Sequence, residues 1–238
     1  MLYLIGIGLS AKGVTLEALE AINKSSKIYL ESYTVDFPYK IGELEKTIKK
    51  KIDKLDRASV ESDKIILEAK KENVCLLVYG SPLFATTHVS LIMDADKSRV
   101  KVKIIYSASV LDGIAETGLQ LYKFGKISSM PKWQKNFEPD SFLDFILKNQ
   151  SINAHSLILV DIGLLYLEAI IQFNKVMILK NLKFDDVIVC SNLGTDKSKI
   201  YYGKFSKLKK KDVVSPFCFI IPADMHFLEK ESIERFRV

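Results

Sequence analysis

Four short apolar runs divide the first half of the chain and limit what it can fold into. They lie at 2–7, 27–30, 74–79 and 100–105. Because the runs are mainly apolar and most do not alternate with polar residues, the predicted strands should be buried on both faces. Helical patterns separate the runs, and such alternation is typical of a parallel sheet covered by helices on both faces. We therefore predict an α/β fold in which residues 1–110 form an N-terminal lobe with a mainly parallel sheet.

The second half of the chain has more strand–turn–strand character. A helix is predicted at 111–119 and another from Ser141, and apolar runs follow at 155–162, 187–195, 199–205 and 216–229. Late strands joined by turns favour antiparallel pairs beside parallel ones. We predict a second α/β lobe with a mixed sheet over residues 111–238, although no Pro/Gly/Ser-rich linker marks the boundary.

Charge and cysteine content narrow the function classes. The net charge is +6, and the 35 basic residues include only four arginines, Arg57, Arg99, Arg235 and Arg237. Surfaces that read bases favour arginine and interleaved aromatic residues, so we expect no nucleic-acid partner. The lysine run 204–211 is expected to be a solvated face or a docking point for an acidic protein. The three cysteines lie in or at the end of apolar runs, and we interpret them as reduced core residues without a metal.

No apolar run reaches the length of a membrane span. The N-terminal MLYLIGIG has no basic region before it and no cleavage site after it, so it is interpreted as a strand and not as a signal peptide. We therefore expect a cytoplasmic protein with no membrane partner.

Gly6 and Gly8, with Ala11, match a relaxed dinucleotide-binding pattern, and Glu31 follows the second predicted strand. A pyrophosphate needs a helix N-terminus directly behind the glycines, but the predicted N-cap, Thr15, lies further along. Two alternatives are therefore open for this turn. It could bind a nicotinamide or flavin dinucleotide, or it could bind a different small ligand.

The stretch GSPLFATTH, residues 80–88, follows a buried strand at once. Loops at the carboxyl ends of parallel strands bind ligands in open α/β sheets, so we expect its hydroxyl groups to meet a small molecule there. The serine loop 106–113 follows the next strand in the same way. The alternative is a capped turn that binds nothing. No nucleophile–base pair, metal-ligand spacing or P-loop is present, so an enzyme of this kind would act by positioning its reactants.

Taken in order along the chain, these stretches resemble the diphthine synthase family of the tetrapyrrole-methylase-like superfamily. The resemblance runs from residue 1 to about 229 and rests on MLYLIGIGL, YLESYT, GSPLFATTH, SASV, TGLQLYKFG, EPDSF, HSLILVDI and PADMHFLE. It implies two α/β lobes, a homodimer, S-adenosylmethionine as methyl donor, and elongation factor 2 as substrate, methylated on the amino group of a modified histidine. Carried over by motif, the cofactor-binding positions are Leu9, Ser81, Phe84, Ser109, Val110, Val160, Leu193 and Phe217.

Three departures from the family pattern keep alternatives open. The family has aspartate where this chain has Ser81 and glycine where it has Phe84, and the apolar stretch 164–166 replaces a polar one. One alternative is a non-enzymatic paralogue with a degenerate cofactor site that binds proteins, and another is a related methyltransferase acting on a tetrapyrrole or on ribosomal RNA. No catalytic residue is assigned. His88 is either a proton acceptor or a structural residue at the start of a helix.

Overall fold

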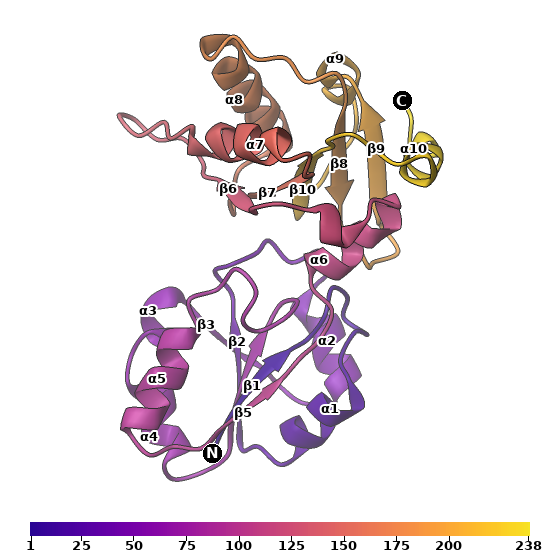
Figure 1. Ribbon diagram of the computed structural model, residues 1–238. Helices are drawn as coiled ribbons and strands as arrows, with labels where there is room; N and C mark the ends of the chain where they lie inside the picture. The colour runs from indigo at the N-terminus through magenta and orange to yellow at the C-terminus, as the bar shows by residue number, and fades with distance from the viewer. The chain divides into compact units, whose positions relative to one another are not determined.

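The computed structural model describes residues Met1–Val238. The chain forms two compact units, Met1–Asp112 and Gly113–Val238. Each unit is an α/β structure built on its own five-stranded sheet (Figure 1). None of the helices is both long and apolar enough to cross a bilayer.

The sheet of the N-terminal unit has the strand order β3-β2-β4-β1-β5, and every neighbouring pair is parallel. Its strands are β1 (Leu2–Gly6), β2 (Lys27–Glu31), β3 (Asp53–Leu55), β4 (Val74–Val78) and β5 (Val102–Ile105). The predicted mainly parallel sheet is therefore confirmed. Its three central strands carry the apolar runs, because their side chains are buried on both faces.

Helices cover both faces of this sheet. They are α1 (Leu16–Asn23), α2 (Ile41–Ile48), α3 (Arg57–Val60), α4 (Lys64–Ala69) and α5 (Val89–Lys97). Figure 1 shows α1 and α2 on one side and α3, α4 and α5 on the other, and the two hydrophobic clusters follow the same division. The predicted N-cap of α1 is confirmed, since the Thr15 hydroxyl accepts a hydrogen bond from the backbone N–H of Ala18 at 3.1 Å.

The C-terminal unit has a mixed sheet, as predicted, in the order β6-β7-β10-β8-β9, with β6 and β7 parallel and the other pairs antiparallel. Its strands are β6 (Ser128–Met130), β7 (Ser156–Val160), β8 (Val187–Ser191), β9 (Lys199–Gly203) and β10 (Phe217–Ile221). Its helices are α6 (Val110–Gly113), which begins in the preceding unit, α7 (Ser141–Ser151), α8 (Tyr166–Leu179), α9 (Phe205–Leu208) and α10 (Phe227–Glu234). Helices α7, α8 and α9 pack against one face of the sheet around Phe173 and Phe219. All three cysteines are buried and unpaired by disulfides, as expected.

Helix assignments in the C-terminal half were the least accurate predictions. The pattern over 111–119 predicts one helix, but α6 gives way to a 3₁₀ turn at Ile114–Thr117, which ends at Gly118 with a φ of 81°. The apolar PADMHFLE stretch predicts strand and turn, whereas the chain turns into α10 after His226. No helix is predicted over 166–179, although α8 is the longest helix of the chain.

A buried carboxylate joins three segments of the C-terminal unit. Glu229 of α10 is 1% exposed, and its two oxygens accept hydrogen bonds from the Gln120 N–H at 2.8 Å, His155 Nε2 at 3.0 Å, Lys123 Nζ at 2.6 Å and the His226 N–H at 2.7 Å. Three of the family-like stretches of the sequence meet in this group, TGLQLYKFG, HSLILVDI and PADMHFLE. We call these five residues the Glu229 cluster.

His155 of the Glu229 cluster is neutral and has one defined tautomer. Its Nδ1 accepts a hydrogen bond from the Ala223 N–H at 2.9 Å, so the ring proton lies on Nε2, which donates to Glu229. Burial lowers the pKa of His155, and the Glu229 hydrogen bond only partly offsets this effect. The cluster is therefore an ordered network in which both Glu229 oxygens and both His155 ring nitrogens have partners.

Candidate functional site

Three loops meet at the carboxyl ends of β4, β1 and β5, which are adjacent in the N-terminal sheet. The turns after β1 and β4 are tied by two backbone hydrogen bonds, from the Gly8 N–H to the Gly80 oxygen at 3.2 Å and from the Gly80 N–H to the Gly8 oxygen at 3.0 Å. The loop after β5 joins them through the Ser107 hydroxyl, which donates to the Gly13 oxygen at 3.2 Å. The stretches singled out in the sequence are thus brought together. We call them the three-loop site.

The loops after β1 and β4 lead to opposite faces of the sheet. From β1 the chain leads to α1 on one face, whereas from the neighbouring β4 it leads to α5 on the opposite face. Loops that leave adjacent strand ends toward opposite faces form a topological switch point, where open α/β sheets bind ligands. The fold therefore places the three-loop site where a small molecule is expected.

Glycines allow the close approach of the three loops. A Cβ atom on Gly6 would lie 2.5 Å from the Gly80 oxygen, 2.9 Å from Pro82 Cδ and 3.1 Å from the Ser107 N. Gly8 and Gly80 have φ angles of 70° and 72°, which residues with side chains rarely adopt. These positions explain why the sequence has glycine at the end of β1 and directly after β4.

Five of the predicted cofactor residues lie in this site, Leu9, Ser81, Phe84, Ser109 and Val110, and they differ in burial and in hydrogen bonding. Leu9 is buried, and its backbone oxygen accepts a hydrogen bond from the Tyr79 hydroxyl at 3.1 Å. Ser81 is half-buried, and its hydroxyl makes no hydrogen bond within the chain. Phe84 is half-buried and closes a turn by donating its N–H to the Ser81 oxygen at 3.2 Å. Val110 begins α6 and is also half-buried. Ser81 therefore offers the unengaged hydroxyl of the loop.

The hydroxyl groups of the serine loop are already engaged, contrary to the expectation that they face a ligand. The buried Ser109 donates its hydroxyl to Asp112 Oδ2 at 3.0 Å and accepts from the Leu111 N–H at 3.2 Å. Its backbone N–H also donates to Asp112, at 2.6 Å. Ser107 is bound to Gly13, so both serines hold the loops in place.

The other three predicted cofactor residues, Val160, Leu193 and Phe217, lie in the C-terminal unit. Phe217 starts β10 opposite Ser191, and Cys218 pairs with Leu159, so Val160 ends β7 at the same edge of the sheet. Leu193 and Phe217 are buried, and the Phe217 ring contacts Tyr166 with a centroid distance of 5.5 Å.

His88 has a structural role in the loop after β4. Its Nδ1 lies 3.1 Å from the Pro82 oxygen, which can only accept, so Nδ1 carries the proton and donates. Burial lowers the pKa of this imidazole, which keeps it neutral. Thr86 donates to the same oxygen at 3.0 Å. The loop is thus held by two donors on one carbonyl oxygen. The prediction that Thr86 or Thr87 caps α5 is wrong, because no side chain caps this helix.

A dinucleotide site is not supported by the geometry. Helix α1 begins at Leu16, too far behind Gly8 for its N-terminal amides to reach a pyrophosphate held by the turn. Glu31 is 0% exposed, accepts a hydrogen bond from the Thr34 hydroxyl and cannot present its carboxylate to a ribose. Burial raises the pKa of Glu31. The nicotinamide or flavin alternative is therefore set aside.

Comparison with known proteins agrees with this geometry. The family described as Tetrapyrrole (Corrin/Porphyrin) Methylases matches residues 1–209. The diphthine methyl ester synthase of Dictyostelium discoideum is 36% identical, with 100% of this chain and 98% of that protein covered. The diphthine synthase of Methanococcus vannielii is also 36% identical, with 98% of each chain covered.

Solved structures agree as well. One from Entamoeba histolytica has a TM-score of 0.90 and 32% identity, and covers 100% of this chain and 98% of its own. A crystal structure of diphthine synthase has a TM-score of 0.86 and 27% identity, and the match covers 100% of this chain and 96% of that one. The predicted fold class, with its parallel and mixed sheets, is confirmed by these structures. The chain therefore belongs to the tetrapyrrole methylase family and, within it, to the diphthine synthases, which are methyltransferases.

Proposed function

We propose that this protein transfers a methyl group from S-adenosylmethionine to the amino group of a modified histidine in elongation factor 2, in the synthesis of diphthamide. The observation that carries the proposal is the three-loop site, in which Gly8 and Gly80 lock adjacent turns at a topological switch point. The names of the full-length relatives point to the same pathway. They favour this substrate over a tetrapyrrole or ribosomal RNA, and an enzyme over a non-enzymatic paralogue.

The residues of the three-loop site fit a cofactor with polar groups on an apolar body. Ser81 presents a hydroxyl without a partner, Leu9 and Val110 are apolar, and the ring of Phe84 offers a face for packing. We propose that Ser109 contributes through its backbone, because its hydroxyl is bound to Asp112. In the C-terminal unit, Val160, Leu193 and Phe217 would complete the set assigned by resemblance.

The proposed chemistry makes few demands on side chains. When bound, the cofactor supplies an electrophilic methyl carbon on a sulfonium. The protein must hold an amine lone pair about 3–3.5 Å from that carbon and in line with the leaving sulfur. Excluding water lowers the pKa of the amine and frees its lone pair. Since His88 is buried and bound to Pro82, we assign it to loop positioning and not to proton transfer.

Calorimetric titration with S-adenosylmethionine and S-adenosylhomocysteine tests the first half of the proposal. We expect saturable binding of both, with Kd of about 1–100 μM. Incubation with labelled cofactor and elongation factor 2 carrying the modified histidine then tests the substrate, read by mass spectrometry. Absence of binding would contradict the cofactor assignment. Cofactor binding without methylation of elongation factor 2 would contradict the substrate assignment.

Substitution at Ser81 tests whether this hydroxyl contacts the cofactor. Ser81→Asp restores the carboxylate that the family resemblance implies, and a charge-assisted hydrogen bond should tighten cofactor binding about 5–10-fold. Ser81→Ala should weaken it about 3–5-fold. Ser151→Asp, at an exposed serine of α7, is the control and should leave the titration unchanged. Equal affinities in all four proteins would remove Ser81 from the site.

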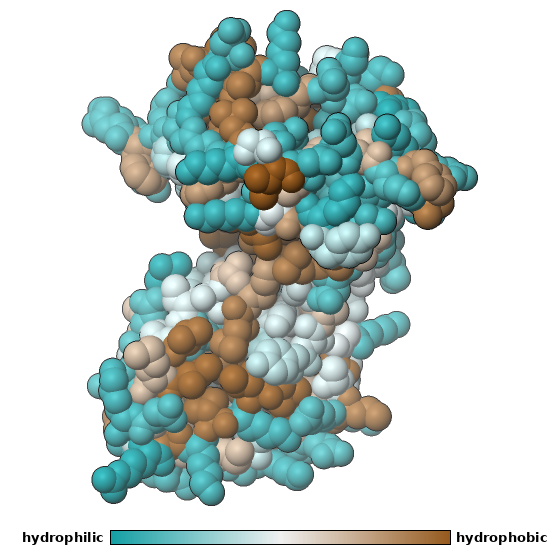
Figure 2. All heavy atoms as spheres, viewed as in Figure 1, coloured by the Kyte–Doolittle hydropathy of each residue, from teal (hydrophilic) through white to brown (hydrophobic).

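We also propose a homodimer, supported by an apolar stripe on α8. Leu167, Ile171 and Ile178 are spaced by four and seven residues, so they share one helical face, and they are 52%, 57% and 78% exposed. Figure 2 shows hydrophobic atoms at the surface where α8 lies. Exposed apolar stripes of this kind mark interaction surfaces.

Light scattering after size exclusion tests the dimer. The wild type should have twice the chain mass of 27.0 kDa, and Ile171→Asp should shift it to the monomer mass. Leu16→Asp, at an isolated exposed leucine of α1, should leave the dimer intact. A wild type that elutes as a monomer at micromolar concentration would contradict the proposal. The predicted cytoplasmic location stays a prediction.

A further inference from the structure

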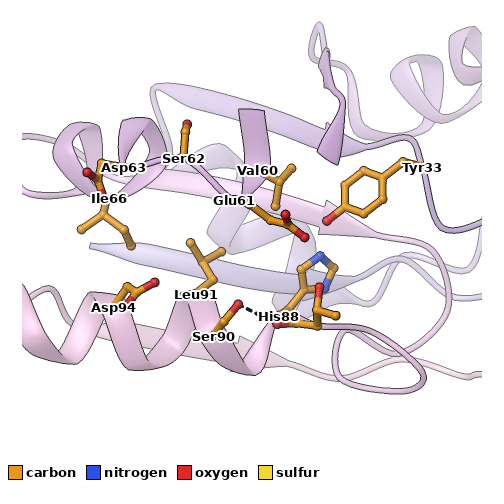
Figure 3. A pocket seen from close by; sticks show the side chains of 11 residues that line it. Tyr33, Val60, Glu61, Ser62, Asp63, Ile66, His88, Ser90, Leu91 and Asp94 are labelled. Atoms are coloured by element: carbon orange, nitrogen blue, oxygen red, sulfur yellow. Dashed lines mark hydrogen bonds between the residues drawn. The ribbon is translucent and has the colours of Figure 1, made fainter. Parts of the chain in front are cut away.

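A small pocket lies in the N-terminal unit between the start of α5 and the segment that joins α3 to α4. Its volume is about 50 Å³, which is room for roughly three to five water-sized groups. This is far below the volume of a cofactor site. Figure 3 shows His88, Tyr33 and Glu61 gathered at one end, Val60 and Leu91 along the middle, and Asp63 and Ile66 at the other end.

The pocket is lined by two buried polar atoms without a hydrogen-bond partner, Nε2 of His88 and the hydroxyl oxygen of Tyr33. His88 is 2% exposed, its Nδ1 donates to Pro82, and its Nε2 makes no hydrogen bond. Because the ring is neutral with its proton on Nδ1, Nε2 presents a lone pair to the pocket. Leaving a buried acceptor without a donor costs free energy, so this atom favours an occupant that donates a hydrogen bond.

The rim of the pocket offers acceptors as well. Glu61, Asp63 and Asp94 line it and are exposed, and no basic side chain lines it. Ser62 and Ser90 donate their hydroxyls to the backbone oxygens of Ser59 and Thr87, and the Ser62 oxygen also accepts from the Lys64 N–H, so each oxygen keeps at least one lone pair for an occupant. The pocket therefore repels anions and favours a group that carries positive charge and several donors.

The nearby cations already have partners, and Lys97 offsets the charge of Asp94 at the rim. Arg57 stacks on the ring of Tyr33 at 5.2 Å, Lys64 lies over the ring of Tyr29 at 5.1 Å, and Lys97 pairs with Asp94 at 2.9 Å. Glu61 and Asp63 have no ion-pair partner within 4 Å in the structure. No group of three His, Cys, Asp or Glu side chains is placed to hold a metal ion.

Apolar side chains line the stretch between the polar ends. Val60, Ile66 and Leu91 are buried and face the pocket. They would contact methylene groups, whereas a hydrated metal ion or a water cluster gains nothing from them. A planar guanidinium is larger and needs acceptors in a fork, while an ammonium is compact and carries three donors.

We propose that this pocket binds a primary ammonium group at the end of an unbranched alkyl chain, with His88 Nε2 and Glu61 accepting its hydrogen bonds. Two sources share this chemistry, a free alkylamine and the side chain of a lysine on a protein. The pocket includes Thr87 and His88, the last two residues of GSPLFATTH. An occupant would therefore contact the loop that Pro82 and His88 hold in place.

The test is an NMR titration of the whole chain labelled with ¹⁵N, using n-butylamine hydrochloride at constant pH and ionic strength. We expect saturable shifts confined to residues around the pocket, with a Kd of about 1 mM, and a shift of the His88 Nε2 resonance without protonation. Sodium butyrate and tetramethylammonium chloride are the control ligands and should cause no saturable shifts there. Nα-acetyl-lysine methylamide, titrated in the same way, distinguishes the sources, since its binding shows that a lysine of a protein fits.

Two variants separate binding at the pocket from loss of fold. Glu61→Gln removes an exposed charge and should weaken butylamine binding about tenfold. His88→Asn keeps a donor for the Pro82 oxygen and removes Nε2, and it should weaken binding by at least as much. Glu20→Gln, on α1, should leave binding unchanged, and thermal unfolding confirms that each variant folds.

Equal shifts with butylamine and tetramethylammonium, or wild-type affinity in a folded Glu61→Gln or His88→Asn protein, would overturn the assignment. Absence of saturable shifts up to about 50 mM would also overturn it, because an ammonium site built as described should be occupied at that concentration.

Discussion

Replacing Gly6 by alanine is expected to abolish binding of S-adenosylmethionine and to lower the free energy of unfolding by about 2–3 kcal/mol. The added Cβ would lie 2.5 Å from the Gly80 oxygen, and 2.9 Å from Pro82 Cδ. Both belong to the loop after β4, and the Gly80 oxygen accepts the hydrogen bond from Gly8 that fastens two turns together. Neither neighbour is the mobile end of a flexible side chain, so the three-loop site must open.

Gly42→Ala is the matched control for this variant. Gly42 lies in α2, and a Cβ there would meet no atom within 4 Å. Since alanine favours helix, this variant should raise the free energy of unfolding by about 0.5–1 kcal/mol and leave cofactor binding unchanged. Urea unfolding and calorimetric titration measure both effects. A Gly6→Ala protein that binds cofactor as the wild type does would show that the loop contacts are not needed.

Replacing Glu229 by glutamine is expected to lower the free energy of unfolding at pH 7 by about 3 kcal/mol. The carboxylate accepts four hydrogen bonds, one of them from the Lys123 ammonium at 2.6 Å. Glutamine has one acceptor oxygen, and its amide group would face donors. The half-buried Lys123 ammonium and the His226 N–H would then lack a full set of partners.

The same residue predicts how stability depends on pH. Burial raises the pKa of Glu229, but the hydrogen bonds from Gln120, Lys123, His226 and His155 outweigh it and lower the pKa from 4.5 to about 2. A carboxyl group whose pKa is lower in the folded state stabilises the fold fully above pH 4.5, and the effect is lost as pH falls toward 2. Between pH 7 and pH 3 the wild type should therefore lose about 2 kcal/mol through this residue alone.

Urea unfolding at pH 7 and pH 3 checks this prediction. The free energy of unfolding at pH 7 minus that at pH 3 should be about 2 kcal/mol smaller in Glu229→Gln than in the wild type. Glu231→Gln, an exposed position on the same helix, should keep the wild-type difference. If both variants behave alike, the pH dependence does not come from the Glu229 cluster.

The N-terminal fold could be predicted from sequence because burial on both faces produces uninterrupted apolar runs. Three of the five parallel strands begin at the predicted residue, at Leu2, Lys27 and Val74, and β5 begins two residues later than expected. The short β3 was missed, since two of its three residues are exposed and charged. Edge strands of that kind carry no apolar run to detect.

Helix α8 was missed for the opposite reason. It buries Ala169, Ile170 and Phe173 on one side and exposes Ile171 and Ile178 on another, so apolar residues occur all around it. A helical period is visible in a sequence only when one face is polar. If the exposed stripe is covered in a dimer, the missing amphipathic period is a consequence of assembly.

That the three loops lie together could be predicted, but the hydrogen-bond partners of their hydroxyl groups could not. The loops follow strands that are adjacent in the sheet, so the sheet topology brings them together. Sequence patterns do not show which hydroxyl has a partner. Ser107 and Ser109 are engaged within the chain, whereas Ser81 is not, and that difference depends on loop geometry.

The Glu229 cluster also bears on how such chains can change over evolution. Three of the stretches by which this sequence resembles its family meet there, and in the structure they stabilise the C-terminal unit. Selection can preserve them for folding alone, while positions such as Ser81 and Phe84 vary in a separate unit. A lineage can therefore change the loop after β4 without disturbing the residues that stabilise the C-terminal unit.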